Sequence, residues 1–387
     1  MRNPLSDKIT TIKPSGIRQF FDLVSEMKDA ISLGVGDFDT PWRIREEGIY
    51  TLEKGKTYYT SNSGLMDLRI EISRYLERRF GLNYDAEKEI IVTVGGSEGI
   101  DLAFRAMLNP GDEVIIPEPC YVSYVPCVTL ADGVPVTVNL KEENDFKLTK
   151  EQLLSAITPR TKILVLAFPN NPTGAVMTKE ELEEIAEVVK EKDIFVVSDE
   201  IYAELSYGNT RHCSIASIDG MKERTIVING FSKAHAMTGW RLGYACGPEV
   251  IIKQMLKIHQ FAIMCAPTNS QYAAVEALRE CDDAVEEMRN EYDRRRRFML
   301  SKLRGMGLKV FEPYGAFYIF PNIAEFGLTS DEFATRFLTE EKVAVVPGTA
   351  FGDCGEGFLR MSYASSLSNL KTAMERLEKF IDRLRNK

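Results

Sequence analysis

Seven short runs rich in Val, Ile and Leu constrain the fold of this chain more than any other feature of its sequence. Several runs are almost continuously apolar rather than alternating, which is typical of strands covered on both faces. Helical patterns separate many of them, and this alternation indicates an α/β fold with a largely parallel sheet. The predicted strands are Ile90–Val94, Glu113–Pro117, Val134–Leu140, Lys162–Phe168, Ile194–Ser198, Thr225–Asn229 and Arg241–Cys246.

Two helices carry start signals. Thr178 is followed three residues later by Glu181, which is a capping-box pattern, and apolar residues then recur at helical spacing. Thr149 and Gln152 repeat the pattern. We therefore expect helices to begin after Thr149 and after Thr178.

The character of the chain changes after about Cys281. A charged helix pattern, three short strand patterns and a terminal helix pattern predict a smaller α+β unit. We expect a large α/β domain over residues 45–280, and a small α+β domain that contains residues 1–44 and 281–387 and contributes to the substrate site. The predicted elements of the small unit are the helix Glu286–Leu303, the strands Tyr314–Phe320, Val343–Val346 and Phe358–Ser362, and the helix Lys371–Leu384.

Composition excludes several classes of function. The formal net charge of -9 argues against a general nucleic-acid binder. Seven scattered cysteines without a CxxC pair fit reduced thiols in a cytoplasmic protein, and three histidines without ligand spacing argue against a metal site. Met1–Pro14 lacks the apolar segment of a signal peptide, and no run approaches membrane-spanning length. We therefore expect a cytoplasmic protein with no nucleic-acid or membrane partner.

A lysine with reactive potential follows the predicted strand Thr225–Asn229. Lys233 has the hydroxyl of Ser232 beside it and Arg241 eight positions later. The ends of strands are where open α/β sheets place their ligands. A desolvated lysine forms a Schiff base with an aldehyde, and an arginine with a hydroxyl suits a phosphate. Aldehyde and phosphate together describe pyridoxal 5′-phosphate (PLP); the alternative is a surface lysine after a buried strand.

A glycine-rich turn, Gly95–Gly99, follows the first predicted strand and opens a helix. Paired glycines let backbone amides approach an anion at a helix N-terminus. The turn is neither G-x-G-x-x-G nor a P-loop, which argues against a nicotinamide dehydrogenase.

Three other segments place polar groups in or after predicted strands. The rigid turn Pro169–Gly174 presents an asparagine amide to a phenolic oxygen, or is only a turn. Asp199 pairs with a protonated pyridine nitrogen and makes the ring an electron sink, or caps a helix. Arg360 binds a carboxylate through both arms of its guanidinium, or forms an internal salt bridge.

The order and spacing of Asn170–Gly174, Ser198–Tyr202 and Ser232–Tyr244 resemble the fold-type-I PLP-dependent aminotransferases of class I/II. The similarity is strongest to bacterial and archaeal aspartate and aromatic aminotransferases, and it runs nearly end to end. It implies a mostly parallel seven-stranded sheet with helices on both faces, plus a smaller α+β domain. Further matching segments are Ile31–Gly34, Asp37–Pro41, Gly64–Arg69, Val345–Gly348 and Arg360–Ala364.

The resemblance also implies roles for residues around the ring of PLP. Lys233 would hold PLP as a Schiff base and later move the proton. Asp199 would pair with the pyridine nitrogen, and Asn171 and Tyr202 would bond the phenolic oxygen. Tyr121 would stack on the ring.

By the same resemblance, the phosphate and the substrate bind at separate places. Arg360 would clamp the substrate α-carboxylate, aided by Asn171 and the backbone of Gly34. Tyr59 matches a residue that reaches the phosphate of the partner subunit, which implies a homodimer with shared active sites. The phosphate would be bound by the backbone amides of Gly96, Ser97 and Glu98, together with Ser232 and Arg241.

Departures from the family pattern bear on the substrate. Gly36 stands where proline is frequent, and Ser97 stands where some aspartate-preferring relatives carry lysine. We therefore expect an aromatic amino donor first and aspartate next, with a 2-keto acid such as 2-oxoglutarate as acceptor in a ping-pong reaction. The residues expected to line an apolar pocket are Ile17, Phe20, Phe21 and Tyr121.

Two alternatives keep the cofactor but change the function. One is a C–S β-lyase on the same fold. The other is a non-catalytic PLP-binding regulator, which usually carries an attached DNA-binding domain, whereas here the aminotransferase pattern starts almost at Met1.

Overall fold

A seven-stranded sheet forms the centre of the computed structural model, which describes residues 2, 4–14, 27, 29–34 and 39–386. The strand order is β2-β8-β7-β6-β5-β3-β4; β8 runs antiparallel to both neighbours, and the pairings from β7 to β4 are parallel. Each strand overlaps one of the seven predicted runs, so the α/β fold is confirmed. The strands are β2 (Ile90–Thr93), β3 (Glu113–Glu118), β4 (Val134–Asn139), β5 (Thr161–Leu166), β6 (Phe195–Asp199), β7 (Thr225–Gly230) and β8 (Gly243–Cys246).

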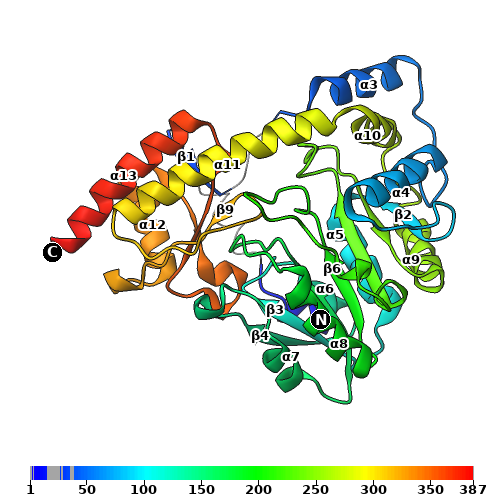
Figure 1. Cartoon of the computed structure of the whole chain (residues 1–387), viewed down its shortest axis with the longest axis horizontal. Helices are drawn as coiled ribbons and strands as arrows, with labels where there is room; N and C mark the ends of the chain where they lie inside the picture. The colour runs from blue at the N-terminus through cyan, green and yellow to red at the C-terminus, as the bar shows by residue number, and fades with distance from the viewer. Residues whose placement is uncertain (1, 3, 15–26, 28, 35–38, 387) are drawn as a thin grey trace.

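The central strands bury side chains on both faces, which explains their nearly continuous apolar sequence. Ile163 and Val165 of β5 pack into one cluster with α5, α6 and α9, whereas Leu164 and Leu166 pack into another with α7 and α8. The edge strand β4 instead has partly exposed side chains. Figure 1 shows these helices around the sheet. Their bounds are α5 (Gly95–Met107), α6 (Tyr124–Leu130), α7 (Lys150–Ala156), α8 (Lys179–Glu191) and α9 (Glu249–Ala262).

The predicted helix starts are confirmed. Thr149 and Thr178 each accept a hydrogen bond from the backbone three residues on, and Gln152 and Glu181 complete both capping boxes. The β2 end of the sheet is covered by α4 and α10. Before residue 281, the described part of the chain also contains α1 (Asp7–Thr11), α3 (Trp42–Glu53), α4 (Met66–Phe80) and α10 (Thr268–Glu280).

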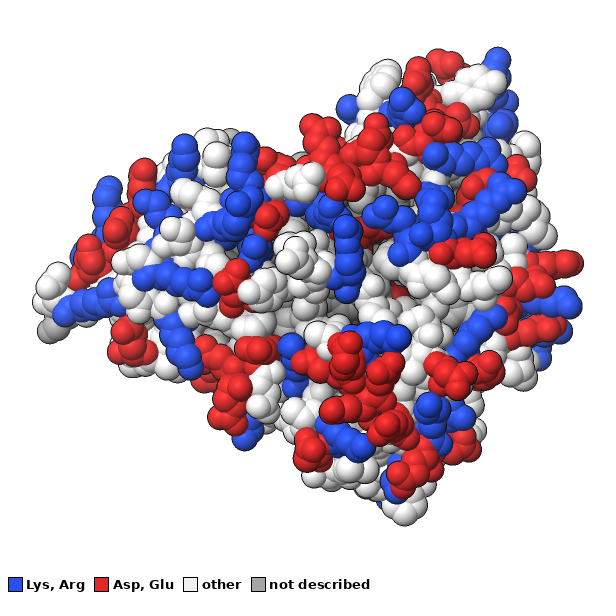
Figure 2. Space-filling view, viewed as in Figure 1, with Lys and Arg blue, Asp and Glu red and all other residues white. Residues whose placement is uncertain are grey.

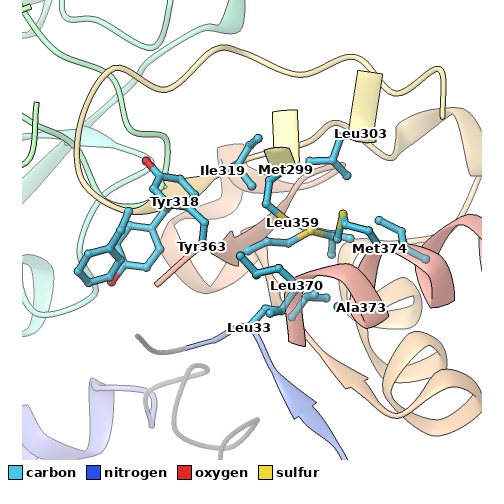
Figure 3. Packing of buried hydrophobic residues seen from close by; sticks show 14 of the residues in the cluster. Leu33, Met299, Leu303, Tyr318, Ile319, Leu359, Tyr363, Leu370, Ala373 and Met374 are labelled. Atoms are coloured by element: carbon cyan, nitrogen blue, oxygen red, sulfur yellow. The ribbon is translucent and has the colours of Figure 1, made fainter. Parts of the chain in front are cut away.

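Two smaller sheets lie beside three long helices, α11 (Asp282–Gly305), α12 (Ser330–Glu341) and α13 (Leu367–Arg385). Their shared core contains Leu33 and Leu359, and Figure 3 shows several of its side chains together. One sheet pairs β1 with β10 in parallel; the other has the antiparallel order β11-β12-β9. The strands are β1 (Ile31–Ser32), β9 (Tyr318–Ile319), β10 (Val343–Ala344), β11 (Val346–Pro347) and β12 (Leu359–Ser362).

Three predicted strand bounds are wrong. Tyr314–Phe320 forms a strand only at Tyr318–Ile319, and Val343–Val346 divides between two different sheets. The run from Arg241 becomes a strand only at Gly243, because Arg241 has a φ of 53°, in the left-handed region that a strand does not use. Apolar composition predicted these segments, but backbone turns shortened them.

Acidic and basic side chains are interspersed over the face of the molecule seen in Figure 2. Within the described ranges, no helix has the length and apolar character needed to cross a membrane.

Candidate active site

Four predicted site residues follow four neighbouring strands of the large sheet. Lys233 lies beyond the end of β7, and Asp199 is the last residue of β6. Asn171 lies in the turn after β5, and Tyr121 follows β3. Because these strands are parallel, their carboxyl ends share one edge of the sheet, where α/β proteins bind ligands.

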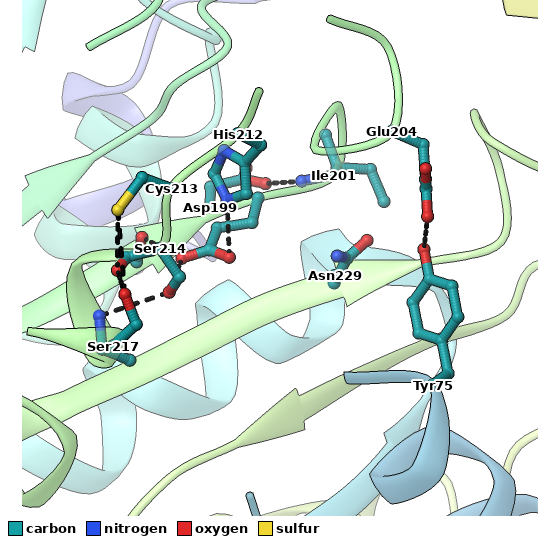
Figure 4. Close-up of polar contacts among 12 residues, drawn as sticks. Tyr75, Asp199, Ile201, Glu204, His212, Cys213, Ser214, Ser217 and Asn229 are labelled. Atoms are coloured by element: carbon teal, nitrogen blue, oxygen red, sulfur yellow. Dashed lines mark hydrogen bonds and ion pairs between the residues drawn. The ribbon is translucent and has the colours of Figure 1, made fainter. Parts of the chain in front are cut away.

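Asp199 is a buried carboxylate, with 8% of its surface exposed. One oxygen accepts a hydrogen bond from the hydroxyl of Tyr124 at 2.7 Å. The other accepts from the backbone N–H of Ile201 at 3.2 Å (Figure 4). Burial raises the pKa of Asp199, although the Tyr124 hydrogen bond opposes this shift. Among the described residues Asp199 forms no salt bridge, so a cationic ring nitrogen would supply the partner that this carboxylate lacks.

Aromatic rings surround the amino group of Lys233. Its Nζ atom lies 5.4 Å from the ring centre of Phe317 and 5.9 Å from that of Tyr202. The hydroxyls of Tyr202 and Tyr318 are 3.1 Å apart. This partly buried lysine is therefore placed in the kind of apolar surroundings in which an amine becomes a nucleophile.

The first turn of α5 forms a cradle of backbone amides. Gly95 has a φ of 75°, and a Cβ there would come within 2.7 Å of the Arg241 guanidinium; a Cβ at Gly243 would come within 2.6 Å of Gly96 N. The glycines thus allow Arg241 and β8 to approach the start of the helix. The N–H groups of Gly96 and Ser97 belong to the first turn, which has no carbonyl partners inside the helix. These features fit a phosphate group.

Beside this cradle, the predicted ring-stacking residue is in contact with the first turn of α5. The hydroxyl of Tyr121 lies 3.2 Å from the hydroxyl of Ser97. Ser232 is partly buried, next to Lys233.

Arg360 is buried, with 3% of its surface exposed. It donates to Asn171 Oδ1 at 3.0 Å and to the carbonyl of Gly34 at 2.5 Å, so three predicted substrate-binding residues meet. The rings of Tyr318 and Phe351 lie 4.3 and 4.7 Å from the guanidinium carbon.

No carboxylate neutralises this guanidinium in the part of the chain that the structure describes. Its Nε atom is buried without a hydrogen-bond partner there, and burial lowers the pKa of Arg360. An internal salt bridge, the alternative to anion binding, is therefore not found among these residues. A buried arginine without a carboxylate partner has the charge and the free N–H group to bind an incoming carboxylate.

Sequence reasoning missed three aromatic residues of the site. Tyr124 lies three positions after Tyr121, and that spacing is the only local indication of its contact with Asp199. Tyr318 and Phe351 come from distant segments and had no local indication.

The predicted residue Tyr59 does not join the site. It is 74% exposed, and no contact with the other predicted residues is found in the described part of the chain. The predicted residues Ile17, Phe20, Phe21 and Gly36 lie outside the described residues.

Metal chemistry has no candidate centre here: over the described residues, no group of three or more His, Cys, Asp or Glu side chains could hold an ion.

Comparison with known proteins gives a consistent result. The family model for aminotransferase class I and II matches residues 28–377. The chain is 49% identical to an aspartate aminotransferase of Pyrococcus abyssi, over 97% of this chain and 98% of that protein. It is 46% identical to aromatic-amino-acid aminotransferase 2 of Thermococcus litoralis, with the same coverage of both chains.

Solved structures agree. The crystal structure of the aromatic aminotransferase of Pyrococcus horikoshii superposes with a TM-score of 0.90 at 47% identity, covering 94% of this chain and 99% of that one. With matches of this extent in sequence and in fold, the chain belongs to the class I and II aminotransferase family and is an aminotransferase of fold type I.

Proposed function

We propose that this aminotransferase uses PLP to move the amino group of an L-amino acid, aromatic before aspartate, to a 2-keto acid such as 2-oxoglutarate by a ping-pong mechanism. The observation that carries this proposal is the arrangement of Asp199 and Lys233 at one sheet edge, together with the unpaired Arg360. A cationic ring nitrogen would pair with Asp199, an aldehyde carbon would react with Lys233, and a substrate carboxylate would bind Arg360.

The chain's own residues would hold PLP at its phosphate, at its ring and at its phenolic oxygen. The first-turn amides of α5, with Ser232 and Arg241, would bind the phosphate. Asp199, fixed by Tyr124 and the Ile201 N–H, would pair with the ring nitrogen. Tyr121 would stack on the ring.

The phenolic oxygen would be the third point of contact. Asn171 Oδ1 already accepts from Arg360, which leaves the amide N–H groups of Asn171 to donate to that oxygen. Tyr202 would supply the second donor, with its hydroxyl oriented by Tyr318.

Proton transfer would be the task of Lys233. When bound, PLP supplies an electron sink for the pair of electrons released at the substrate Cα. Lys233 Nζ would take the proton from Cα and deliver it to the neighbouring carbon of the cofactor. Arg360 would fix the substrate carboxylate and so orient the Cα–H bond toward that amine.

Aromatic side chains around the site favour an aromatic donor. Tyr121, Tyr318 and Phe351 present rings near Ser97 and Arg360, and rings pack favourably on rings. Ser97 itself supplies no cation for a distal carboxylate. The similar proteins include relatives named for aspartate and for aromatic amino acids.

We also propose a homodimer in the cytoplasm. The exposed apolar residues Trp42, Leu52 and Tyr59 on and after α3, with Phe261 on α9, would be covered by the partner subunit. Tyr59 would then reach the phosphate of the partner. All seven cysteines are free thiols, as expected in a reducing compartment.

The domain division we propose is 45–280 for the large domain, and 1–44 with 281–387 for the small one. Its support is that all strands of the large sheet come from the first range, and all strands of the two smaller sheets come from the second.

The deciding experiment compares kcat/KM for phenylalanine, tyrosine and aspartate with 2-oxoglutarate as acceptor. Conversion of the bound cofactor by each donor alone, followed by its absorbance, tests the half-reaction. Aspartate exceeding both aromatics by more than about tenfold, or roughly 1.4 kcal/mol, would overturn the aromatic preference. Release of pyruvate and ammonia from cystathionine would instead establish the β-lyase alternative.

A further inference from the structure

The side chain of Glu98, in the first turn of α5, is held at both of its carboxylate oxygens. One oxygen accepts a hydrogen bond from the backbone N–H of Val94 at 2.5 Å. The other lies 2.7 Å from Nδ1 of His259, which comes from α9, 161 positions later in the chain. Only the backbone amide of Glu98 was expected to take part in the site, so this carboxylate is an unassigned feature.

The position of this carboxylate creates a conflict with the proposed phosphate site. The start of a helix favours negative charge because its N–H groups are unpaired and its dipole is positive there. A carboxylate in the first turn of α5 could rotate onto the amides of Gly96 and Ser97, which a phosphate would need. Holding both carboxylate oxygens prevents this competition.

Among the described residues, the side chain of His259 has no polar partner other than Glu98. It is 0% exposed, and its Nε2 atom is buried without a hydrogen-bond partner among the described residues. Leaving one polar atom of a buried side chain without a hydrogen-bond partner destabilises the folded protein. A hydrocarbon side chain would avoid this cost, so the contact with Glu98 is the feature that an imidazole provides and an apolar residue does not.

We propose that His259 is a positioning residue of the phosphate site: it holds the Glu98 carboxylate away from the first-turn amides of α5, so that these amides stay available to the 5′-phosphate. This role rests on the proposed binding of PLP.

The test measures the affinity of the cofactor-stripped protein for PLP and for pyridoxal, which lacks the phosphate, by absorbance titration. In His259→Leu, the Kd for PLP should rise by about tenfold or more, while the Kd for pyridoxal changes by less than about threefold. His259→Asn places an amide N–H near the position of Nδ1, so it should keep the wild-type affinity for PLP.

A second buried histidine provides a matched control. His235 is 2% exposed, and both of its ring nitrogens lack partners in the described part of the chain. His235→Leu removes an equally buried imidazole that does not contact Glu98, and it should leave the ratio of the two Kd values unchanged. The double variant His259→Leu with Glu98→Gln should recover most of the lost affinity, because the competing charge is gone.

The outcomes separate the two proposals. If wild-type protein does not bind PLP, the proposed function fails. If it binds PLP but His259→Leu weakens PLP and pyridoxal equally, or weakens neither, the role of His259 is wrong. Should His259→Leu fail to fold, as judged by circular dichroism, His259→Gln takes its place, because its longer side chain does not put an amide at the Nδ1 position.

Discussion

The two regions of this molecule that we propose to bind anions differ in how they are built. The α5 cradle uses backbone amides, close-packed glycines and the exposed side chain of Arg241. The second region uses a buried side chain, Arg360, with aromatic rings on it and hydrogen bonds to Asn171 and Gly34. The first comes from two short segments of sequence, and the second from five.

This difference in construction indicates how long each site would keep its ligand bound. Backbone amides do not move, so the cradle suits a group that stays bound through the reaction. A buried arginine without a carboxylate partner is stabilised when an anion binds to it, and this stabilisation is lost when the anion leaves. Such a site suits a substrate that exchanges in each half-reaction. We therefore expect substitutions in the α5 cradle to change binding of the cofactor, and substitutions of Arg360 to change binding of the substrate.

The largest effect should come from Lys233, which belongs to neither anion site. In Lys233→Ala, kcat should fall by about 10⁴-fold or more, because the nucleophile and the base are both lost. Both anion sites should survive, so PLP should still bind. Borohydride reduction and peptide mapping of the wild-type protein should place the pyridoxyl group on Lys233; a label on a different lysine would refute the assignment.

Asp199→Asn should have the next largest effect. It removes the charge opposite the ring nitrogen while keeping the shape, so kcat should fall by on the order of 10³-fold, or about 4 kcal/mol. The two anion sites are untouched, and the KM for the amino acid should change little. Near-normal turnover in this variant would contradict the role of Asp199.

The contrast between the sites is tested directly by two matched substitutions. Arg360→Lys keeps a positive charge but loses the paired N–H geometry, so KM should rise by about 10- to 100-fold while PLP stays bound. Arg241→Lys should do the reverse, raising the Kd for PLP by about tenfold with little change in KM. Steady-state kinetics and cofactor titration on both variants test this. If Arg360→Lys instead raised the Kd for PLP and Arg241→Lys raised the KM, the assignment of the two sites would be wrong.

The smallest effect should come from Tyr124→Phe, and the direction of its effect on the pH profile can be predicted. The Tyr124 hydrogen bond lowers the pKa of Asp199 against the raising effect of burial, so its loss should raise that pKa. Activity requires ionised Asp199, and the acidic limb of the kcat profile should therefore move to higher pH, with about a tenfold loss of rate on that limb. A pH profile identical to wild type would show that Tyr124 does not tune Asp199.

Features that depend on local patterns could be predicted from the amino-acid sequence. Strand runs such as Lys162–Phe168 were recognisable because a strand covered on both faces needs apolar residues at every position. The starts of α7 and α8 were recognisable because a capping box is complete within four residues. Lys233 and Arg241 were found together because one loop after β7 carries both.

The surroundings of the buried polar groups could not be predicted from the sequence, because they depend on how distant elements pack. Arg360 donates to Gly34 across 326 positions of sequence, and His259 meets Glu98 across 161. The partner of Asp199, Tyr124, comes from the start of α6. No local pattern marks such contacts, because a buried polar group takes whichever partner the packing of distant elements brings within hydrogen-bond distance.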